Sequence, residues 1–248
     1  MVRIIVPVSG GKDSQACLKM AVLEHGAENV TGLFCDTKFE HPITYKHIDT
    51  MRCLYGARID TVCGGDVLGS CLENKRFPSG TGRFCTDKLK IRETRIYLKS
   101  HAETIGAAQV WYGMRTDESA ERARRYQYRD PDDLHDPHDV IANYPKYLGK
   151  MGIMFRLPIV DWTEKEVLDY LAGEQSPLYS QGFKRVGCFP CLASGDKWKI
   201  KAFEHDDFGK SQQIKVKLVE EETGKSVYTS GIGFKYDNDA QGCLICAI

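Results

Sequence analysis

The chain has 248 residues, of which 42% are hydrophobic and 27% are charged, a composition typical of a soluble globular protein. Its 34 basic side chains balance 34 acidic ones, so no global charge attracts nucleic acid, and any contact with a polyanion must come from a local patch. No apolar run approaches the ~20 residues of a membrane-spanning helix, and the N-terminus lacks the pattern of a signal peptide, so we expect no membrane partner.

The chain contains 10 cysteines, a high count. In a secreted protein this number would indicate a disulfide framework. Because we find no export signal and the pattern is that of an α/β protein, we expect reduced thiols and a cytoplasmic location. Some of the thiols are then available as metal or cluster ligands.

Apolar runs alternate with amphipathic segments over the first half of the chain. Strands are predicted at residues 3–9, 30–37, 57–64 and 108–114, and helices from Ser14 onward, at 43–56 and at 86–100. This alternation predicts an α/β fold with a doubly wound, mostly parallel sheet and helices on both faces. Ligands of such sheets bind at the carboxyl ends of the strands, so Ser9, Asp36 and Met114 are expected at one site.

The second half is less regular. Residues 122–150 are polar and interrupted by prolines, which predicts a loop or insertion. Thr163 and Glu166 fit a capping box at the start of a helix. The last fifty-odd residues form a mixed, lysine-rich tail. We therefore predict a nucleotide-binding domain at 1–186 and a small cysteine-bearing region at 187–248.

The segment Ser-Gly-Gly-Lys-Asp-Ser, residues 9–14, follows the first predicted strand. Successive backbone N–H groups in a glycine-rich turn at a helix N-terminus form an anion cradle, and Lys12 adds a positive charge. The segment lacks the spacing of the Walker pattern. The alternative is a strand-to-helix turn in which Asp13 and Ser14 cap the helix.

"SGGKDS" resembles the PP-loop of the ATP pyrophosphatase superfamily, the adenine nucleotide α-hydrolase-like enzymes with the HUP-like PP-loop fold. Five further blocks resemble the phosphoadenosine phosphosulfate (PAPS) reductase family within it. The agreement runs in order from about residue 4 to 191. The blocks are "LFCDTKFEHPITY", "RFCTDKLK", "YGMRTDESAERAR", "LPIVDWTEKEVLDYL" and "SPLYSQGFKRVGCFPC".

This resemblance implies cleavage of ATP between its α and β phosphates, with Mg²⁺ neutralising charge. Asp36 is expected at an adenosine or metal contact, and Arg115 and Arg122 as clamps on a phosphate or sulfate. In the alternative, Asp36 caps a helix and Arg122 is a solvated surface charge. The expected nucleotide-binding residues are Ser9, Gly10, Gly11, Lys12, Asp13, Ser14, Asp36, Gly113, Arg115 and Arg122. The expected catalytic residues are Lys12, Asp13, Arg115 and Cys85.

Two C-x-x-C pairs, Cys188/Cys191 and Cys243/Cys246, have the arrangement in which one metal or cluster receives two thiolates from each pair. Adenylyl-sulfate reductases of the resembled family hold a 4Fe–4S cluster with a Cys-Cys pair and a C-x-x-C. Here Cys85 is followed by a threonine, so that set does not carry over directly.

Cys243 or Cys246 would complete a site with Cys85, or the two pairs form the site without it. The family context favours an iron–sulfur cluster, with zinc as the alternative. If these cysteines bind no metal, they are small buried residues or a redox pair. The thiols expected in the core are Cys17, Cys35, Cys53, Cys63 and Cys71.

Two basic segments raise the question of nucleic acid. Residues 121–129 interleave arginine with tyrosine, a pattern that suits a nucleic-acid backbone with stacked bases, but a solvated helix face explains it equally well. The lysines of the tail also suggest nucleic-acid binding, but nearby acidic residues weaken that interpretation. These lysines are Lys197, Lys199, Lys201, Lys215 and Lys217.

The resemblance leaves two enzymatic activities open. A thioredoxin-dependent reductase of PAPS or adenylyl sulfate would release sulfite, but such reductases tend to have a degraded loop. The intact loop favours an ATP pyrophosphatase-type sulfurtransferase that adenylates its substrate. Its partners would be an adenine nucleotide, a nucleic-acid substrate or a sulfur-donor protein, and a homo-oligomer stays open. A non-enzymatic sensing subunit is the third and least favoured class.

Overall fold

The structure is a computed structural model that describes residues 2–80 and 82–229. Five parallel strands form one sheet in the order β3-β2-β1-β4-β5. The strands are β1 (Arg3–Val8), β2 (Val30–Cys35), β3 (Arg58–Val62), β4 (Ala108–Trp111) and β5 (Ile153–Arg156). The four strands predicted from the apolar runs are all present, each within a few residues of its predicted ends.

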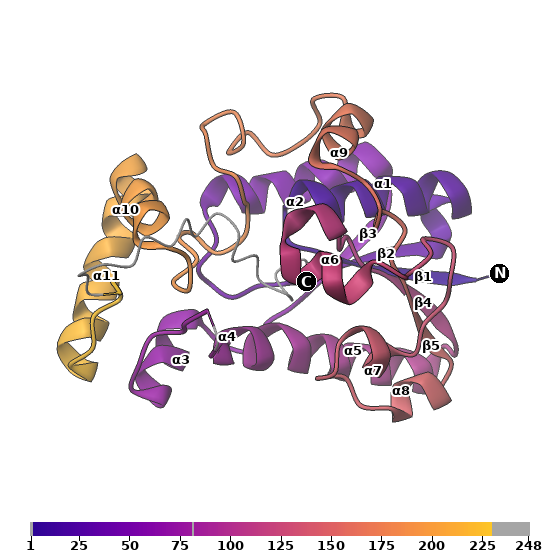
Figure 1. Ribbon diagram of the computed structural model, residues 1–248, viewed down its shortest axis with the longest axis horizontal. Coiled ribbons are helices and arrows are strands. Elements are labelled where there is room, and N and C mark those ends of the chain that lie inside the picture. The colour runs from indigo at the N-terminus through magenta and orange to yellow at the C-terminus, as the bar shows by residue number, and fades with distance from the viewer. Residues whose placement is uncertain (1, 81, 230–248) are drawn as a thin grey trace.

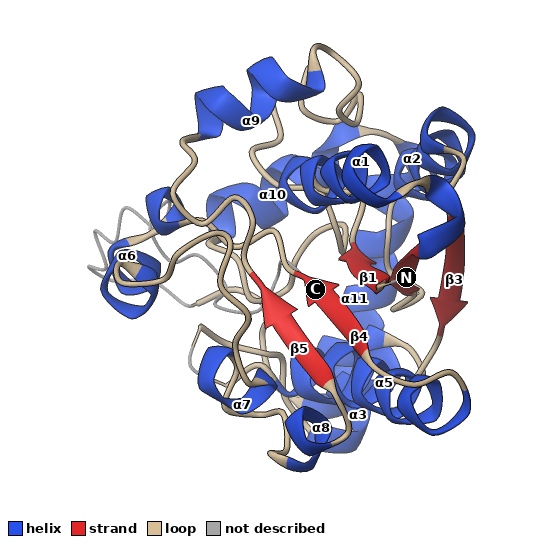
Figure 2. Ribbon diagram, turned by 90° about the vertical axis from the view of Figure 1, so that its right-hand side faces the viewer, coloured by secondary structure: helices blue, strands red, loops and turns tan. Residues whose placement is uncertain are grey.

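Helices cover both faces of the sheet, as Figure 2 shows. Alternate residues of β1 divide between the two faces, since successive side chains of a strand point in opposite directions. Ile5 packs in the cluster under α5 (Arg92–Thr104), whereas Ile4, Val6 and Val8 pack in the cluster under α1 (Lys12–His25), α2 (Pro42–Tyr55) and α9 (Glu164–Leu171). The predicted doubly wound α/β fold is confirmed.

The segment predicted as a loop at 122–150 contains helical turns. They are the C-terminal part of α6 (Ala120–Tyr126), α7 (Pro137–Val140) and α8 (Tyr147–Lys150). Val140, Tyr144 and Leu148 recur every fourth residue, and all three are buried in the core cluster beside β5. The helices are short and are flanked by prolines and aspartates, so the loop prediction was wrong for these turns.

The lysine-rich tail is also more ordered than predicted. It forms α10 (Asp196–His205) and α11 (Asp207–Thr223), which lie beyond the sheet on the side opposite the N-terminus (Figure 1). Phe203 and Val216 pack in the same apolar cluster as Phe39 and Cys71, which come from the first part of the chain. The domain division at residue 187 stays a prediction.

Short elements complete the described fold. They are α3 (Val67–Asn74), α4 (Phe84–Thr86), a π-helical turn at Asp87–Ile91, and 3₁₀ turns at Ala27–Asn29 and Thr116–Glu118. Among the helices that the structure describes, none has the length and apolarity to cross a bilayer.

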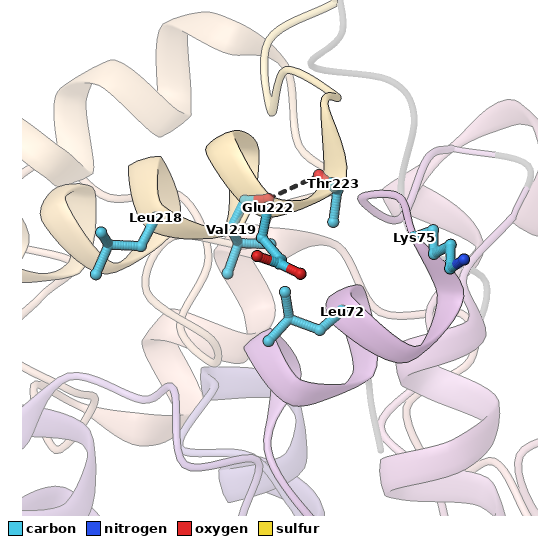
Figure 3. Close-up of a pocket in the computed structure, with 6 residues that line it drawn as sticks. All are labelled: Leu72, Lys75, Leu218, Val219, Glu222 and Thr223. Carbon is cyan, nitrogen blue, oxygen red and sulfur yellow. Dashed lines mark hydrogen bonds between the residues drawn. The ribbon is translucent and has the colours of Figure 1, made fainter.

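A surface groove of about 540 Å³ runs between α3 and α11 (Figure 3). Leu72, Leu218 and Val219 give it an apolar floor, and Lys75, Glu222 and Thr223 line the remainder. None of these residues belongs to the predicted phosphate loop or to the arginine block. The groove is therefore separate from the site predicted from the sequence.

Candidate functional site

The phosphate loop, residues 9–14, lies where the order of strands reverses. β1 is hydrogen-bonded to β2 on one side and to β4 on the other, and a crevice opens at the carboxyl ends of strands at such a point. The two sides meet closely. A Cβ on Gly113, after β4, would lie 2.6 Å from the Asp13 carbonyl carbon and 2.8 Å from the Ser14 nitrogen. Gly113 therefore lets the segment after β4 pack directly against the start of α1.

The backbone of the phosphate loop requires a glycine at residue 10. Gly10 has a φ of +77°, and a Cβ there would also lie 2.8 Å from Thr44 Cγ2. The Ser14 hydroxyl donates to the Gly11 carbonyl (3.0 Å) and accepts from the Ser9 N–H (3.3 Å), which closes the turn on itself. The helix cap is Gly11, with no side-chain hydrogen bond, so the alternative in which Asp13 and Ser14 cap the helix is wrong.

Lys12 turns into the protein, where its side chain is only 5% exposed. Its Nζ lies 3.0 Å from Glu164 Oε1 and 3.8 Å from Asp13 Oδ2. Its backbone N–H donates to the Tyr179 hydroxyl at 3.0 Å, and its Nζ lies 5.0 Å from the centre of the same ring. Tyr179 and Glu164 thus engage the N–H group and the ammonium that would hold an anion.

Arg115 comes from the segment after β4 and is 3% exposed. Its Nε donates to Asp13 Oδ1 at 2.6 Å, and one terminal nitrogen donates to Asp117 Oδ2 at 3.1 Å. The guanidinium therefore fixes the carboxylate at the start of α1. In this arrangement Arg115 positions the phosphate loop, and a phosphate would have to compete with Asp13 for it.

Arg122 is not the solvated surface charge of the alternative interpretation, because it is fully buried on α6. It forms an ion pair with Glu118, and Arg185 lies 3.3 Å from the other oxygen of that carboxylate. Burial raises the pKa of Glu118 above its ordinary value, although Arg122 opposes the shift. These three residues tie the arginine block to the loop before Cys188.

Asp36 follows β2 and is 5% exposed. Its carboxylate accepts the Lys38 N–H (2.8 Å), the Lys38 ammonium (2.6 Å) and the Tyr45 hydroxyl (2.8 Å). Burial disfavours the charge, but the hydrogen bonds from Lys38 and Tyr45 outweigh it and lower the Asp36 pKa. Asp36 holds a turn in which Lys38 has a φ of 58°, and α2 is capped by His41, so Asp36 is not a helix cap.

A second carboxylate, Glu40, lies beside Asp36. It accepts the Thr37 hydroxyl at 2.6 Å and the same Tyr45 hydroxyl at 3.2 Å. The Cys188 thiol lies 3.3 Å from the Thr37 hydroxyl and 3.8 Å from Glu40 Oε1. The loop after β2 and the C-x-x-C segment therefore lie side by side.

Cys85 and Cys188 pack against the same apolar cluster. Burial, followed by the neighbouring Glu40, raises the pKa of Cys188 to about 12, so without a metal its thiol stays protonated. Over residues 2–80 and 82–229, no group of three or more histidine, cysteine or acidic side chains is arranged to hold a metal ion. Cys243 and Cys246 lie outside the described residues. The set Cys188, Cys191, Cys243 and Cys246 therefore stays a prediction.

The other thiols divide into two groups. Cys17, Cys35 and Cys71 are buried, as predicted. Cys53 and Cys63 are exposed, so their prediction as core thiols was wrong. Cys53 lies on the exposed side of α2, and Cys63 follows the last residue of β3, one of the two edge strands of the sheet.

The family model of the phosphoadenosine phosphosulfate reductase domain matches residues 3–194. The chain belongs to this family.

Three curated relatives are similar to this family member. A 37.8 kDa protein of Escherichia phage 186, described as uncharacterized, is 27% identical over 76% of this chain and 66% of its own. Uncharacterized protein MJ0066 of Methanocaldococcus jannaschii is 28% identical over 80% of this chain and 38% of its own. The adenosine 5'-phosphosulfate reductase of Salinibacter ruber is 24% identical over 67% of this chain and 59% of its own. The chain thus matches less than two thirds of each relative's length.

Sequence reasoning missed two side chains that contact the phosphate loop of this family member. Tyr179 lies in the "SPLYSQGF" block, where it was noted but given no role. Glu164 begins α9 and was passed over beside the capping box of Thr163 and Glu166, which the structure confirms. Both come from segments more than 150 residues after Lys12, so no local pattern signals their contact with it.

Proposed function

We propose that this PAPS-reductase-like enzyme splits ATP into AMP and pyrophosphate, and so adenylates a substrate for sulfur transfer. The observation that carries the proposal is the intact phosphate loop at the strand-order reversal, with the Lys12 ammonium turned inward beside Asp13, the carboxylate that Arg115 also contacts. An enzyme that only binds a nucleotide sulfate does not need a lysine to hold a leaving pyrophosphate. An enzyme that catalyses the release of pyrophosphate from ATP does need one.

The charges of the site support binding of the phosphates with a divalent cation. Lys12, Arg115, Arg122 and Arg185 each form an ion pair with a carboxylate of the chain, namely Asp13, Asp117, Glu118 or Glu164. A triphosphate entering this balanced network brings negative charge that no surplus cation offsets. Mg²⁺ would supply the missing positive charge, and Asp36 is the residue we propose to hold it.

The chain's residues act on the phosphates as follows. An oxygen of the acceptor attacks the α phosphorus, and the bond from that phosphorus to the bridging oxygen breaks, so the electron pair leaves with pyrophosphate. N–H groups at the start of α1 and the Lys12 ammonium receive the developing charge. Arg115 keeps the Asp13 carboxylate turned from this path. Incoming sulfur then attacks the substrate atom that carries the adenylated oxygen, and that oxygen leaves with the bonding electron pair as part of AMP.

Thiolate chemistry fits Cys85 and Cys188, but the described residues do not complete a ligand set. The proposed adenylation and sulfur transfer therefore use no cluster. We propose a 4Fe–4S cluster on Cys188, Cys191, Cys243 and Cys246, with Cys85 replacing one of the last two as the alternative and with zinc as the alternative metal.

Reduction of adenylyl sulfate or PAPS is the second candidate, because one relative carries the name adenosine 5'-phosphosulfate reductase. In that activity an enzyme thiol attacks the sulfate sulfur and the adenosine nucleotide leaves. A dithiol such as thioredoxin then attacks the sulfur of that cysteine, so that sulfite leaves and the dithiol ends as a disulfide. The protonated state of Cys188 makes this thiol a poor nucleophile. Cys243 and Cys246 would have to supply the attack.

One pair of assays separates the two activities. The protein is incubated with ATP, Mg²⁺ and candidate acceptors, and separately with PAPS or adenylyl sulfate and reduced thioredoxin. We expect pyrophosphate and AMP in equal amounts from the first mixture. Sulfite from the second mixture without pyrophosphate from the first would overturn the proposal.

A further inference from the structure

We propose that a single-stranded nucleic acid binds at the Trp198 surface, which consists of Lys184, Lys197, Trp198 and Lys201. The three ammonium groups surround one indole ring. Their Nζ atoms lie 5.7 Å (Lys184), 5.9 Å (Lys197) and 5.7 Å (Lys201) from the centre of the Trp198 ring. This proposal rests on the proposed function, for which it names the class of acceptor.

The helical spacing of α10 produces this arrangement. Lys197 and Lys201 are four residues apart and Trp198 and Lys201 are three apart, so all three share one side of the helix. Lys201 also donates to the carbonyl of Gly182, which fixes the preceding loop, including Lys184, against α10. Among residues 2–80 and 82–229, neither Lys197 nor Lys201 has a carboxylate within ion-pair distance.

Lys199, which lies between Lys197 and Lys201 in the sequence, is buried and paired with a carboxylate. It is 2% exposed, forms an ion pair with Asp196 at 2.8 Å and donates to the carbonyl of Val227. One basic run of the tail is thereby divided into a structural lysine and two lysines that face the indole. The tail lysines gave only a weak indication of nucleic-acid binding in the sequence. Because Lys199 is structural, Lys197 and Lys201 are the ones that form a defined surface with Trp198.

The Trp198 surface adjoins the phosphate loop through residues 179–186. Lys184 and Arg185 directly precede Val186, whose carbonyl oxygen lies 3.5 Å from the position of a Cβ on Gly11. Tyr179, at the other end of this loop, accepts the Lys12 N–H. A strand held on the Trp198 surface would therefore pass beside the loop that binds the phosphates of ATP, as an acceptor must.

The chemistry of the surface favours a single strand. An indole offers a flat face on which an unpaired base stacks, and the ammonium groups around it match the phosphates of a backbone. A duplex hides the faces of its bases, and a membrane surface would need several apolar side chains to insert. The Trp198 surface has an aromatic ring on which an unpaired base can stack. It lacks the several apolar side chains that insertion into a membrane would need.

The test is fluorescence anisotropy of a fluorescein-labelled 12-nucleotide oligothymidylate, without ATP, at several salt concentrations. We expect Trp198→Ala to weaken binding about tenfold and Trp198→Phe to restore most of it. Lys197→Glu with Lys201→Glu should weaken binding and lower the salt slope by about 0.7 per lysine. Lys215→Glu with Lys217→Glu on α11 is the matched control for net charge and should leave affinity within about twofold.

Equal losses from both double variants would overturn the proposal, since binding would then follow net charge alone. Binding to vesicles of phosphatidylserine without binding to the oligonucleotide would overturn it in favour of a membrane surface. Melting temperatures of all variants check that they fold. Because the assay contains no ATP, its outcome is independent of pyrophosphate release, so failure of either proposal is visible separately.

Discussion

The phosphate loop and the cysteine-bearing segments were both prominent in the sequence, yet the structure treats them differently. The loop is six consecutive residues that connect β1 to α1 and include the first residues of that helix, and every one of them is described. The thiols come from three separate segments. Cys85 and Cys188 pack against the same cluster, while Cys243 and Cys246 lie outside the described residues. A contiguous motif carries its geometry locally, whereas a dispersed ligand set depends on every contact that brings its parts together.

The two regions also differ in what holds them. Around the loop, charged side chains satisfy one another, with Lys12 near Glu164 and Arg115 near Asp13 and Asp117. Around Cys188 the surroundings are mostly apolar, with Thr37, Glu40 and Lys90 as polar neighbours. An anion can enter the first region by exchanging partners. A metal enters the second only by removing protons from partly buried thiols.

Removal of the Lys12 ammonium is the strongest test of the loop. Lys12→Ala should lower ATP-dependent pyrophosphate release about 100- to 1000-fold, because the leaving group loses its charged donor. The measurement is initial rate at saturating ATP and Mg²⁺. Lys46→Ala, an exposed lysine of α2, is the control and should keep the wild-type rate. Unchanged pyrophosphate release from Lys12→Ala would show that the loop only holds a nucleotide.

Removal of a thiol tests the other region. After anaerobic purification, Cys188→Ser should lose most of its iron and the brown absorbance of the wild type, because a ligand is missing. Cys71→Ser is a matched control, since Cys71 is a fully buried thiol of the same apolar cluster that is in no predicted ligand set. Equal iron in both variants, or a colourless wild type with stoichiometric zinc, would contradict the cluster proposal.

The polar network beneath the loop predicts a pH dependence of stability. His47 Nε2 donates to the Gln15 side chain at 2.8 Å, and burial lowers the His47 pKa from 6.5 to about 4. Between these values the unfolded chain binds the proton and the folded chain does not, so stability is full above pH 6.5 and is lost as pH falls. The loss should reach about 3 kcal/mol near pH 4.

Urea unfolding from pH 7 to 4.5 measures this loss, with His47→Gln as the comparison. The glutamine does not titrate, so the slope of stability against pH should become shallower in the variant. The variant's lower stability at pH 7, from the altered bond to Gln15, does not affect the slope. Parallel slopes for the two proteins would show that other groups dominate.

The same contrast between local and distant determinants explains how far the sequence could be interpreted. The sheet, its helices and the phosphate loop followed from apolar runs and glycines that act on their immediate neighbours. The short helices α7 and α8 were missed because prolines and aspartates interrupt the apolar pattern of Val140, Tyr144 and Leu148. Tyr179 and Glu164 could not be placed at Lys12, because their approach depends on how the chain after β5 returns over the first helix.

Glu164 offers the finest test of the loop, because it occupies the ammonium that we propose for pyrophosphate. Its side chain is 56% exposed, so its ion pair with Lys12 is worth at most about 1 kcal/mol. Glu164→Gln removes a negative charge that ATP must displace, and Mg²⁺-ATP should bind up to about fivefold more tightly by calorimetry. Asp169→Asn, at an exposed ion pair of the same helix, is the control and should not change affinity. Weaker binding by Glu164→Gln would mean that the carboxylate orients Lys12 toward the phosphates instead of competing with them.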